Sequence, residues 1–134
     1  NREKGSARYD SPMSLVRAFR GATQLSADSA DEMKEAVIEL LSAIIESNQL
    51  VNDDLISILF TATPDLRSGF PAAAGRSMGL NDVPLICAQE IEAAGALERT
   101  VRVMIHAYSP LSRGDVQHKY LRGAAVLRPD LGDS

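Results

Sequence analysis

The amino-acid sequence predicts an α+β fold in which a mixed β-sheet packs against one long helix, with short helical turns elsewhere. Strand-like and helix-like patterns follow one another in the order strand, helix, strand, helix and then further strands. The apolar runs in the strands are nearly continuous, whereas one long helix can cover only one face of a sheet. We therefore expect another subunit to cover the second face, and hence an oligomer.

The length of 134 residues fits one domain of ordinary size. Hydrophobic residues make up 45% of the chain and charged residues 24%, which is typical of a soluble globular protein. Residues 1–12 are polar and have no periodicity. We expect them to be a disordered extension or a remnant of expression, and residues 13–134 to form the domain.

The first elements are a strand and the long helix. Residues 14–20 alternate in the manner of a strand, and Gly21 is expected to end it. Ser29 and Glu32 have the spacing of a capping box, which predicts a helix that begins there and ends near Ser47. Its apolar stripe is expected to lie on the sheet and comprises Met33, Val37, Leu40, Leu41, Ile44 and Ile45.

The later elements are shorter. A turn is expected at 52–54, and a second helix is expected to start at Pro71, where the missing N–H is tolerated, and to end near Met78. A helical stretch is expected at 115–121. Strands are expected at 55–63, 83–87, 97–108 and 123–127, and Arg128-Pro129-Asp130 should end regular structure. In the strand 97–108, Arg102, Met104 and His106 are expected to share one face.

The overall charge excludes some classes of function. The formal net charge of −4 argues against a general nucleic-acid binder, although a local arginine cluster can still bind a small anion. No apolar run is long enough to span a bilayer, so no membrane partner is expected. The single cysteine, Cys87, forms neither a disulfide nor a metal-binding pair within the chain, which favours a cytoplasmic protein.

Motifs for phosphate loops, zinc sites and nucleophilic serines are absent. His106 and His118 each stand alone, so a structural role is favoured for both over catalysis. Four arginines lie instead among apolar or small residues of predicted elements, namely Arg20, Arg76, Arg102 and Arg128. Each alone suggests a salt bridge, for example with Glu90, but together they indicate a site for a carboxylate or phosphate.

Ordered segments of the chain resemble the small monofunctional chorismate mutases of the trimeric, Bacillus type. The resemblance covers about residues 15–131 without large gaps. It rests on 17–23 (RAFRGAT), 61–66 (TATPDL), 70–72 (FPA), 83–84 (VP), 87–90 (CAQE), 95–97 (GAL), 101–104 (VRVM), 120–121 (YL) and 126–131 (VLRPDL). It implies a trimeric pseudo-α/β barrel with sites between subunits, chorismate as substrate, prephenate as product, and a place in aromatic amino-acid biosynthesis.

The resemblance also implies roles for individual residues. Arg102 corresponds to the arginine at the ether oxygen of the breaking C–O bond. Glu90 and Cys87 correspond to a pair that binds the ring hydroxyl, and Arg20 and Tyr120 to groups that hold carboxylates. The residues implied to line the site are Phe70, Ala72, Ala73, Arg76, Leu127 and Arg128, with Phe70 and Arg76 contributed by the neighbouring subunit. The rearrangement is intramolecular, so no metal, cofactor, acid–base group or nucleophile is expected.

Two departures from the family pattern stand out. Ala73 occupies the position of a lysine near the site entrance, and Ile86 replaces a polar residue beside Cys87. Two other interpretations stay open at this point. One is a non-catalytic or imine-hydrolysing trimer of similar fold that binds a small ligand, because fold alone does not fix function. The other is a structural subunit whose arginines only form salt bridges.

Overall fold

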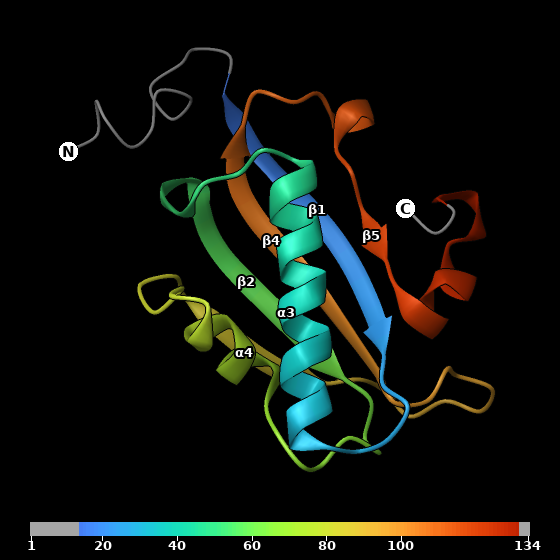
Figure 1. Cartoon of the computed structure of the whole chain (residues 1–134). Coiled ribbons are helices and arrows are strands. Elements are labelled where there is room, and N and C mark those ends of the chain that lie inside the picture. The colour runs from blue at the N-terminus through green and yellow to red at the C-terminus, as the bar shows by residue number, and fades with distance from the viewer. Residues whose placement is uncertain (1–13, 132–134) are drawn as a thin grey trace.

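The computed structural model of the protein describes residues 14–131. The extension expected at residues 1–12 therefore lies outside the described residues. One five-stranded mixed sheet forms the centre of the fold, with the strand order β3-β2-β4-β1-β5. Its strands are β1 (Leu15–Gln24), β2 (Leu55–Ala62), β3 (Leu85–Gln89), β4 (Thr100–Ser109) and β5 (Lys119–Tyr120). The two helices, α3 (Ala30–Ser47) and α4 (Pro71–Ser77), lie on one face of this sheet (Figure 1).

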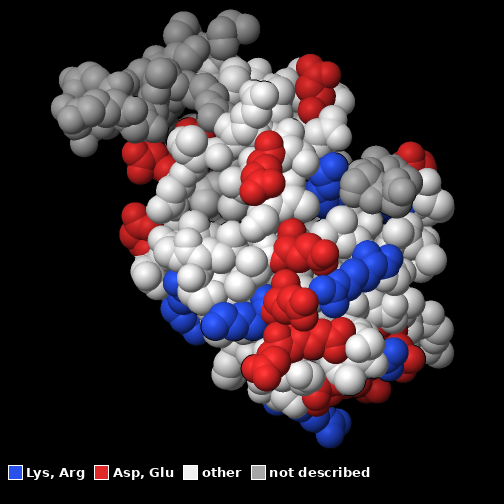
Figure 2. All heavy atoms as spheres, viewed as in Figure 1, with Lys and Arg blue, Asp and Glu red and all other residues white. Residues whose placement is uncertain are grey.

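The long helix α3 begins as the sequence predicts, but with half of the expected cap. The Ser29 hydroxyl accepts a hydrogen bond from the Glu32 N–H at 3.2 Å. The Glu32 carboxylate, however, accepts from the backbone N–H of Ser26 at 2.7 Å and not from Ser29. The contacts with Ser26 and Arg122 hold this side chain, which is only 19% exposed, against the protein. The exposed surface of α3 is acidic, as Figure 2 shows.

The core lies between the sheet and the helices. The expected stripe of α3 is buried from Met33 to Ile44, and Ile45 packs at its edge. It meets every second residue of the strands, including Phe19 of β1, Phe60 of β2 and Ile105 of β4. The strand positions between them, Arg102, Met104 and His106 among them, face away from the helices as the alternation predicts.

This second face of the sheet is open over much of its area. Cross-strand pairing places Ile86, Leu59 and Met104 side by side on β3, β2 and β4. Ile86 is 63% exposed and Val16, on β1, is 53% exposed. Only the end of the face near Ala22 is covered within the described chain, where the C-terminal segment packs against it. No helix in residues 14–131 is long and apolar enough to cross a membrane.

Strand β1 corrects one prediction. It continues through Gly21 to Gln24 instead of ending at Arg20. A Cβ atom on Gly21 would lie 2.7 Å from the Lys119 carbonyl oxygen and 2.8 Å from Ile44 Cδ1. The glycine therefore permits close packing of β5 and α3 within a continuous strand, and it does not mark a turn.

The C-terminal third corrects three more. The helix expected at 115–121 is a 3₁₀ turn over Arg113–Asp115 followed by the two-residue strand β5. The strand expected at 123–127 is a 3₁₀ helix over Arg122–Leu127, and a further 3₁₀ turn at Pro129–Leu131 continues regular structure. Because β5 already pairs with the free edge of β1, the apolar residues after it pack on the sheet face instead.

Candidate active site

A row of residues crosses all five strands on the open face of the sheet. Register pairs Ala88 with Thr61, Thr61 with Arg102, Arg102 with Ala22, and Ala22 with Tyr120. Arg102 is thus held in the middle of the sheet by strands on both sides. Because β4 is the central strand, the backbone that carries this guanidinium is held in place. That suits a group that must bind a ligand in one orientation.

Arg102 is oriented by an acidic residue that follows β3. Its Nε atom lies 2.9 Å from Oε2 of Glu90. The Thr61 hydroxyl donates to the same oxygen at 2.6 Å, and the Glu90 N–H donates to the Ala62 carbonyl at 2.9 Å. Within residues 14–131, no side chain binds the two Nη groups of Arg102. The pair therefore fixes the guanidinium while leaving donors for a ligand.

A hollow of about 260 Å³ lies beside this pair. Arg20, Arg102, Thr61, Met104 and Tyr120 are among its lining residues. Tyr120 is buried against Ala22 and Ala124, with Leu97 and Leu127 at the edge of that small cluster. The hollow thus combines two guanidinium groups with an apolar wall, a combination that binds a small organic anion.

Arg128 is the third arginine at this end of the sheet. Its guanidinium carbon lies 5.9 Å from the centroid of the Tyr120 ring, a cation–π contact. Its Nη2 atom pairs with Oδ2 of Asp130 at 2.9 Å, and the hydrogen bond from Arg128 lowers the pKa of Asp130. The 3₁₀ helix before it brings Leu127 to the same cluster.

His118 positions the strand that carries Arg20. Its Nδ1 atom accepts a hydrogen bond from the Arg20 backbone N–H at 3.0 Å. Burial lowers the pKa of His118, and the positive charges of Arg20 and Arg128 lower it further. A neutral ring is required, since Nδ1 must keep its lone pair to accept this bond. His118 lies in the coil before β5 and not in a helix.

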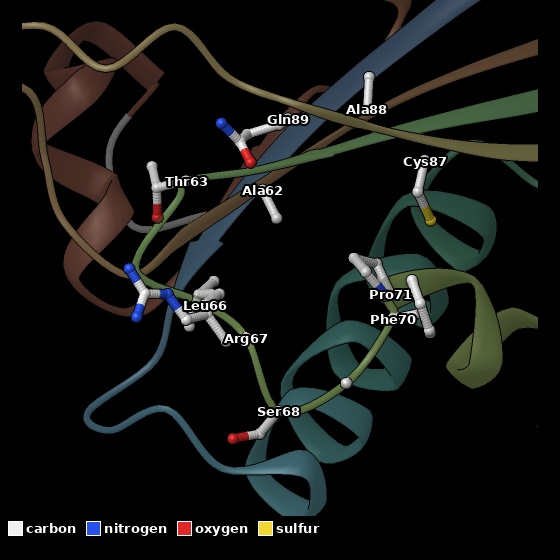
Figure 3. Close-up of a pocket in the computed structure, with 11 residues that line it drawn as sticks. Ala62, Thr63, Leu66, Arg67, Ser68, Phe70, Pro71, Cys87, Ala88 and Gln89 are labelled. Carbon is white, nitrogen blue, oxygen red and sulfur yellow. The ribbon is translucent and has the colours of Figure 1, made fainter.

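A second hollow, of about 440 Å³, lies on the helix-covered side of the sheet. Phe70, Pro71, Arg67 and Cys87 are among its lining residues. Figure 3 shows the Cys87 thiol pointing toward Phe70 and Pro71, on the opposite side of β3 from Ala88. Within one subunit, Cys87 and Glu90 therefore project from different faces of the sheet.

The predicted residues of α4 lie on this second side too. Phe70 is 72% exposed just before the helix, and Ala73 and Arg76 are exposed on it. The side chain of Ala72 belongs to the core. The structure thus separates the predicted residues into two groups. The first group lies at or beside the first hollow and comprises Arg20, Glu90, Arg102, Tyr120, Leu127 and Arg128. In the second group, Phe70 and Cys87 line the second hollow, and Ala73 and Arg76 are exposed on α4, whose first residue, Pro71, lines it too.

Sequence reasoning missed two residues of the first group. Thr61 was part of a predicted strand but was not recognised as a hydrogen-bond donor to Glu90. His118 was read as a structural histidine, which its contact with the Arg20 backbone bears out, but without that partner. Neither contact has a signal in the sequence, because each depends on the register between strands far apart in the chain. No cluster of metal-ligating side chains occurs in the part of the chain that the structure describes.

Comparison with known proteins identifies close relatives. The family model of type I chorismate mutases matches residues 16–131. The chain is 38% identical over 118 residues to chorismate mutase AroH of Bacillus subtilis, covering 87% of this chain and 93% of that enzyme. It is 39% identical over 118 residues to chorismate mutase AroH of Thermus thermophilus, covering 87% and 97%. The solved structure of a chorismate mutase from Clostridium thermocellum matches with a TM-score of 0.81 at 44% identity, covering 82% of this chain and 98% of that one.

Proposed function

The chain belongs to the type I chorismate mutase family and is a chorismate mutase, an isomerase of aromatic amino-acid biosynthesis, and we propose that Arg102 is the centre of its active site. The family match decides against the two interpretations that the sequence left open. The observation that carries the proposal is the Arg102–Glu90 pair on the open face of the sheet, beside a hollow that Arg20 and Tyr120 also line.

The reaction makes few chemical demands on the protein. Chorismate rearranges to prephenate when one C–O bond breaks and one C–C bond forms within the same molecule, so no proton is transferred. The reacting carbons must first be brought together in a compact chair. Oriented binding of two carboxylates and a ring hydroxyl selects that conformer. Arg20 and the Tyr120 hydroxyl are our candidates for the carboxylates, and Glu90 is our candidate for the hydroxyl.

Electrostatic stabilisation is the second requirement. The C–O bond breaks ahead of C–C bond formation, so negative charge gathers on the ether oxygen in the transition state. A fixed cation at that oxygen stabilises the transition state more than the substrate. The guanidinium of Arg102 is permanently charged and is already oriented through Nε by Glu90, with its Nη groups left as donors.

We further propose that each complete site lies between two subunits of a homotrimer. The open sheet face carries exposed Val16, Leu59 and Ile86, an apolar surface that a monomer would leave in water. In addition, Phe70 and Cys87 line a hollow on the other side of the fold from Arg102, and Ala73 and Arg76 are exposed on helix α4, which begins at the wall of that hollow. A neighbouring subunit would supply this second group to the first hollow. The cytoplasmic location stays a prediction.

The assay for this function is the loss of chorismate absorbance on addition of the purified protein, with mass determination by light scattering in the same buffer. We expect saturable turnover by a species of three chains. A well-folded protein without turnover would refute the active-site proposal, and a monomer with full activity would refute a site shared between subunits.

A further inference from the structure

The segment 119–131 carries Tyr120, Leu127 and Arg128 but has little regular pairing to the rest of the fold. Strand β5 pairs with β1 at two positions, Lys119 with Gly21 and Tyr120 with Ala22. One further backbone bond joins the Leu121 N–H to the Ala22 carbonyl at 2.9 Å. Figure 1 shows the segment at the edge of the sheet, beyond β1. These few backbone bonds do not fix the position of the 3₁₀ helix Arg122–Leu127, so a side-chain contact must contribute.

Arg122, the first residue after these bonds, has an uncommon backbone conformation. Its φ angle is 53°, in the left-handed region that residues with a Cβ atom rarely adopt. Gly123 follows, and a Cβ atom there would collide with the side-chain amide of Gln24. The chain thus turns sharply over β1 at this point. A glycine would adopt the Arg122 conformation more readily, so the arginine side chain must contribute something that offsets the strain.

The side chain of Arg122 crosses to helix α3. Its Nε atom donates to Oε1 of Glu39 at 3.0 Å, and its Nη1 atom lies 3.4 Å from Oε2 of Glu32. Glu32 is itself fixed, because Ser26 donates to it from both its backbone N–H and its hydroxyl. The hydrogen bonds from Ser26 lower the pKa of Glu32, and the charge of Arg122 lowers it further. Figure 2 shows basic side chains beside the acidic surface of α3.

We propose that Arg122 is a positioning residue, which clamps the C-terminal segment to α3 and thereby sets the place of Tyr120 and Arg128 at the substrate site. This role rests on the proposed function. Tyr120 lies two residues before Arg122, and the 3₁₀ helix that leads to Arg128 begins at Arg122. Buried Ala124 connects this 3₁₀ helix to β5 and β1, because it packs against Tyr120 and Ala22. A shift at Arg122 would therefore move Tyr120, a predicted carboxylate-binding group, together with Arg128, which is predicted to line the site.

Arg122→Gly is the sharpest test, since glycine fits the φ angle and removes only the clamp. We expect the KM for chorismate to rise by about three- to ten-fold while kcat stays within about two-fold, because Arg102 is untouched. Amide hydrogen exchange of residues 121–128 should become faster. Glu39→Gln should show the same effects at smaller size, because the contact with Glu32 remains.

Arg99→Gly is the matched control. Arg99 also has a positive φ angle, 48°, and pairs with a carboxylate, Glu98 at 3.0 Å. Its hydrogen bonds are to Asp65 and the Leu25 carbonyl, which lie outside the segment 119–131. Its KM should equal that of the wild type. An unchanged KM in a folded Arg122→Gly protein, or unchanged exchange at 121–128, would overturn the positioning role. A wild type without turnover would instead refute the proposed function itself, and the two failures are therefore distinct.

Discussion

The Nε atom of Arg102 and the Oε2 atom of Glu90 lie 2.9 Å apart, although one residue is in the middle of β4 and the other follows β3. The strand between them, β2, supplies Thr61, whose hydroxyl binds the same carboxylate oxygen. This arrangement separates two tasks within one guanidinium: one edge is held by the protein and the other is left for a ligand.

Replacement of Arg102 should affect the chemical step most. We expect Arg102→Ala to lower kcat by on the order of 10²–10³ or more, because it removes the charge at the developing oxyanion. Arg113→Ala, at an exposed arginine of a 3₁₀ turn, is the control and should keep wild-type activity. Chorismate consumption measures both, after circular dichroism has established folding. A kcat of Arg102→Ala within a few-fold of wild type would show that another group serves the ether oxygen.

Thr61→Val tests the support of the Arg102–Glu90 pair. Valine keeps the shape of threonine but cannot donate to Glu90, so the carboxylate and its partner become less well fixed. We expect kcat/KM to fall roughly ten-fold, the effect of losing one hydrogen bond to a charged group. Ser57→Ala, on the same strand and outside the row that contains Arg102, should leave kcat/KM unchanged. Equal values for the two variants would contradict a supporting role for Thr61.

Mixing two impaired variants tests whether sites are shared. Arg102→Ala and Arg76→Ala each remove a residue from one of the two groups. A site shared between one subunit of each variant can therefore contain both intact arginines. Random reassembly of a trimer after mixing in equal amounts should restore about one quarter of the sites. The measurement is turnover after joint refolding, with each variant refolded alone as the control. Activity no higher than the mean of the two parents would argue for sites within single subunits.

His118 should make stability depend on pH. Burial and nearby positive charge lower its pKa in the folded state, so the unfolded chain binds the proton more readily. The folded state should therefore lose stability as the pH falls through about 6.5, the ordinary histidine value, until the lower folded pKa is passed. Above that window the contribution is constant.

Urea unfolding at about pH 7.5 and about pH 5.5 measures this effect, since the two conditions lie on either side of the ordinary histidine pKa. His118→Asn is the matched variant, because asparagine can still accept from the Arg20 N–H but does not titrate. We expect the wild type to lose more stability on acidification than this variant. An identical loss in both proteins would mean that His118 titrates normally.

The sequence alone was sufficient for the sheet, the long helix and the faces of β4, because strict alternation and a helical stripe are strong local signals. It was insufficient where the identity of a residue is explained by its contacts with a distant segment of the chain. Gly21 looked like a strand end, whereas the Lys119 carbonyl and Ile44 require its missing side chain. Residues 115–121 and 123–127 were assigned to the wrong elements because a two-residue strand has no alternation to detect.

The candidate site divides in the same way. The placement of four arginines among apolar or small residues indicated an anion site, and the family resemblance implied roles for them, for Glu90 and for Tyr120, which stay predictions. The separation of Cys87 from Glu90 by the sheet was not predicted, because it depends on which face of β3 each residue occupies. Thr61 and the clamp at Arg122 were also missed, since hydrogen-bond partners 29 and 83 residues apart leave no trace in spacing.

The bare apolar face of the sheet has a consequence for how this protein must be handled. In the proposed homotrimer, each copy keeps the exposed Val16, Leu59 and Ile86 out of water only when partners are available, so protein concentration should affect both folding and catalysis. On dilution, the melting temperature should fall and specific activity should fall with it. An assay in very dilute solution would then underestimate the specific activity of the assembled enzyme, because part of the protein would be dissociated subunits.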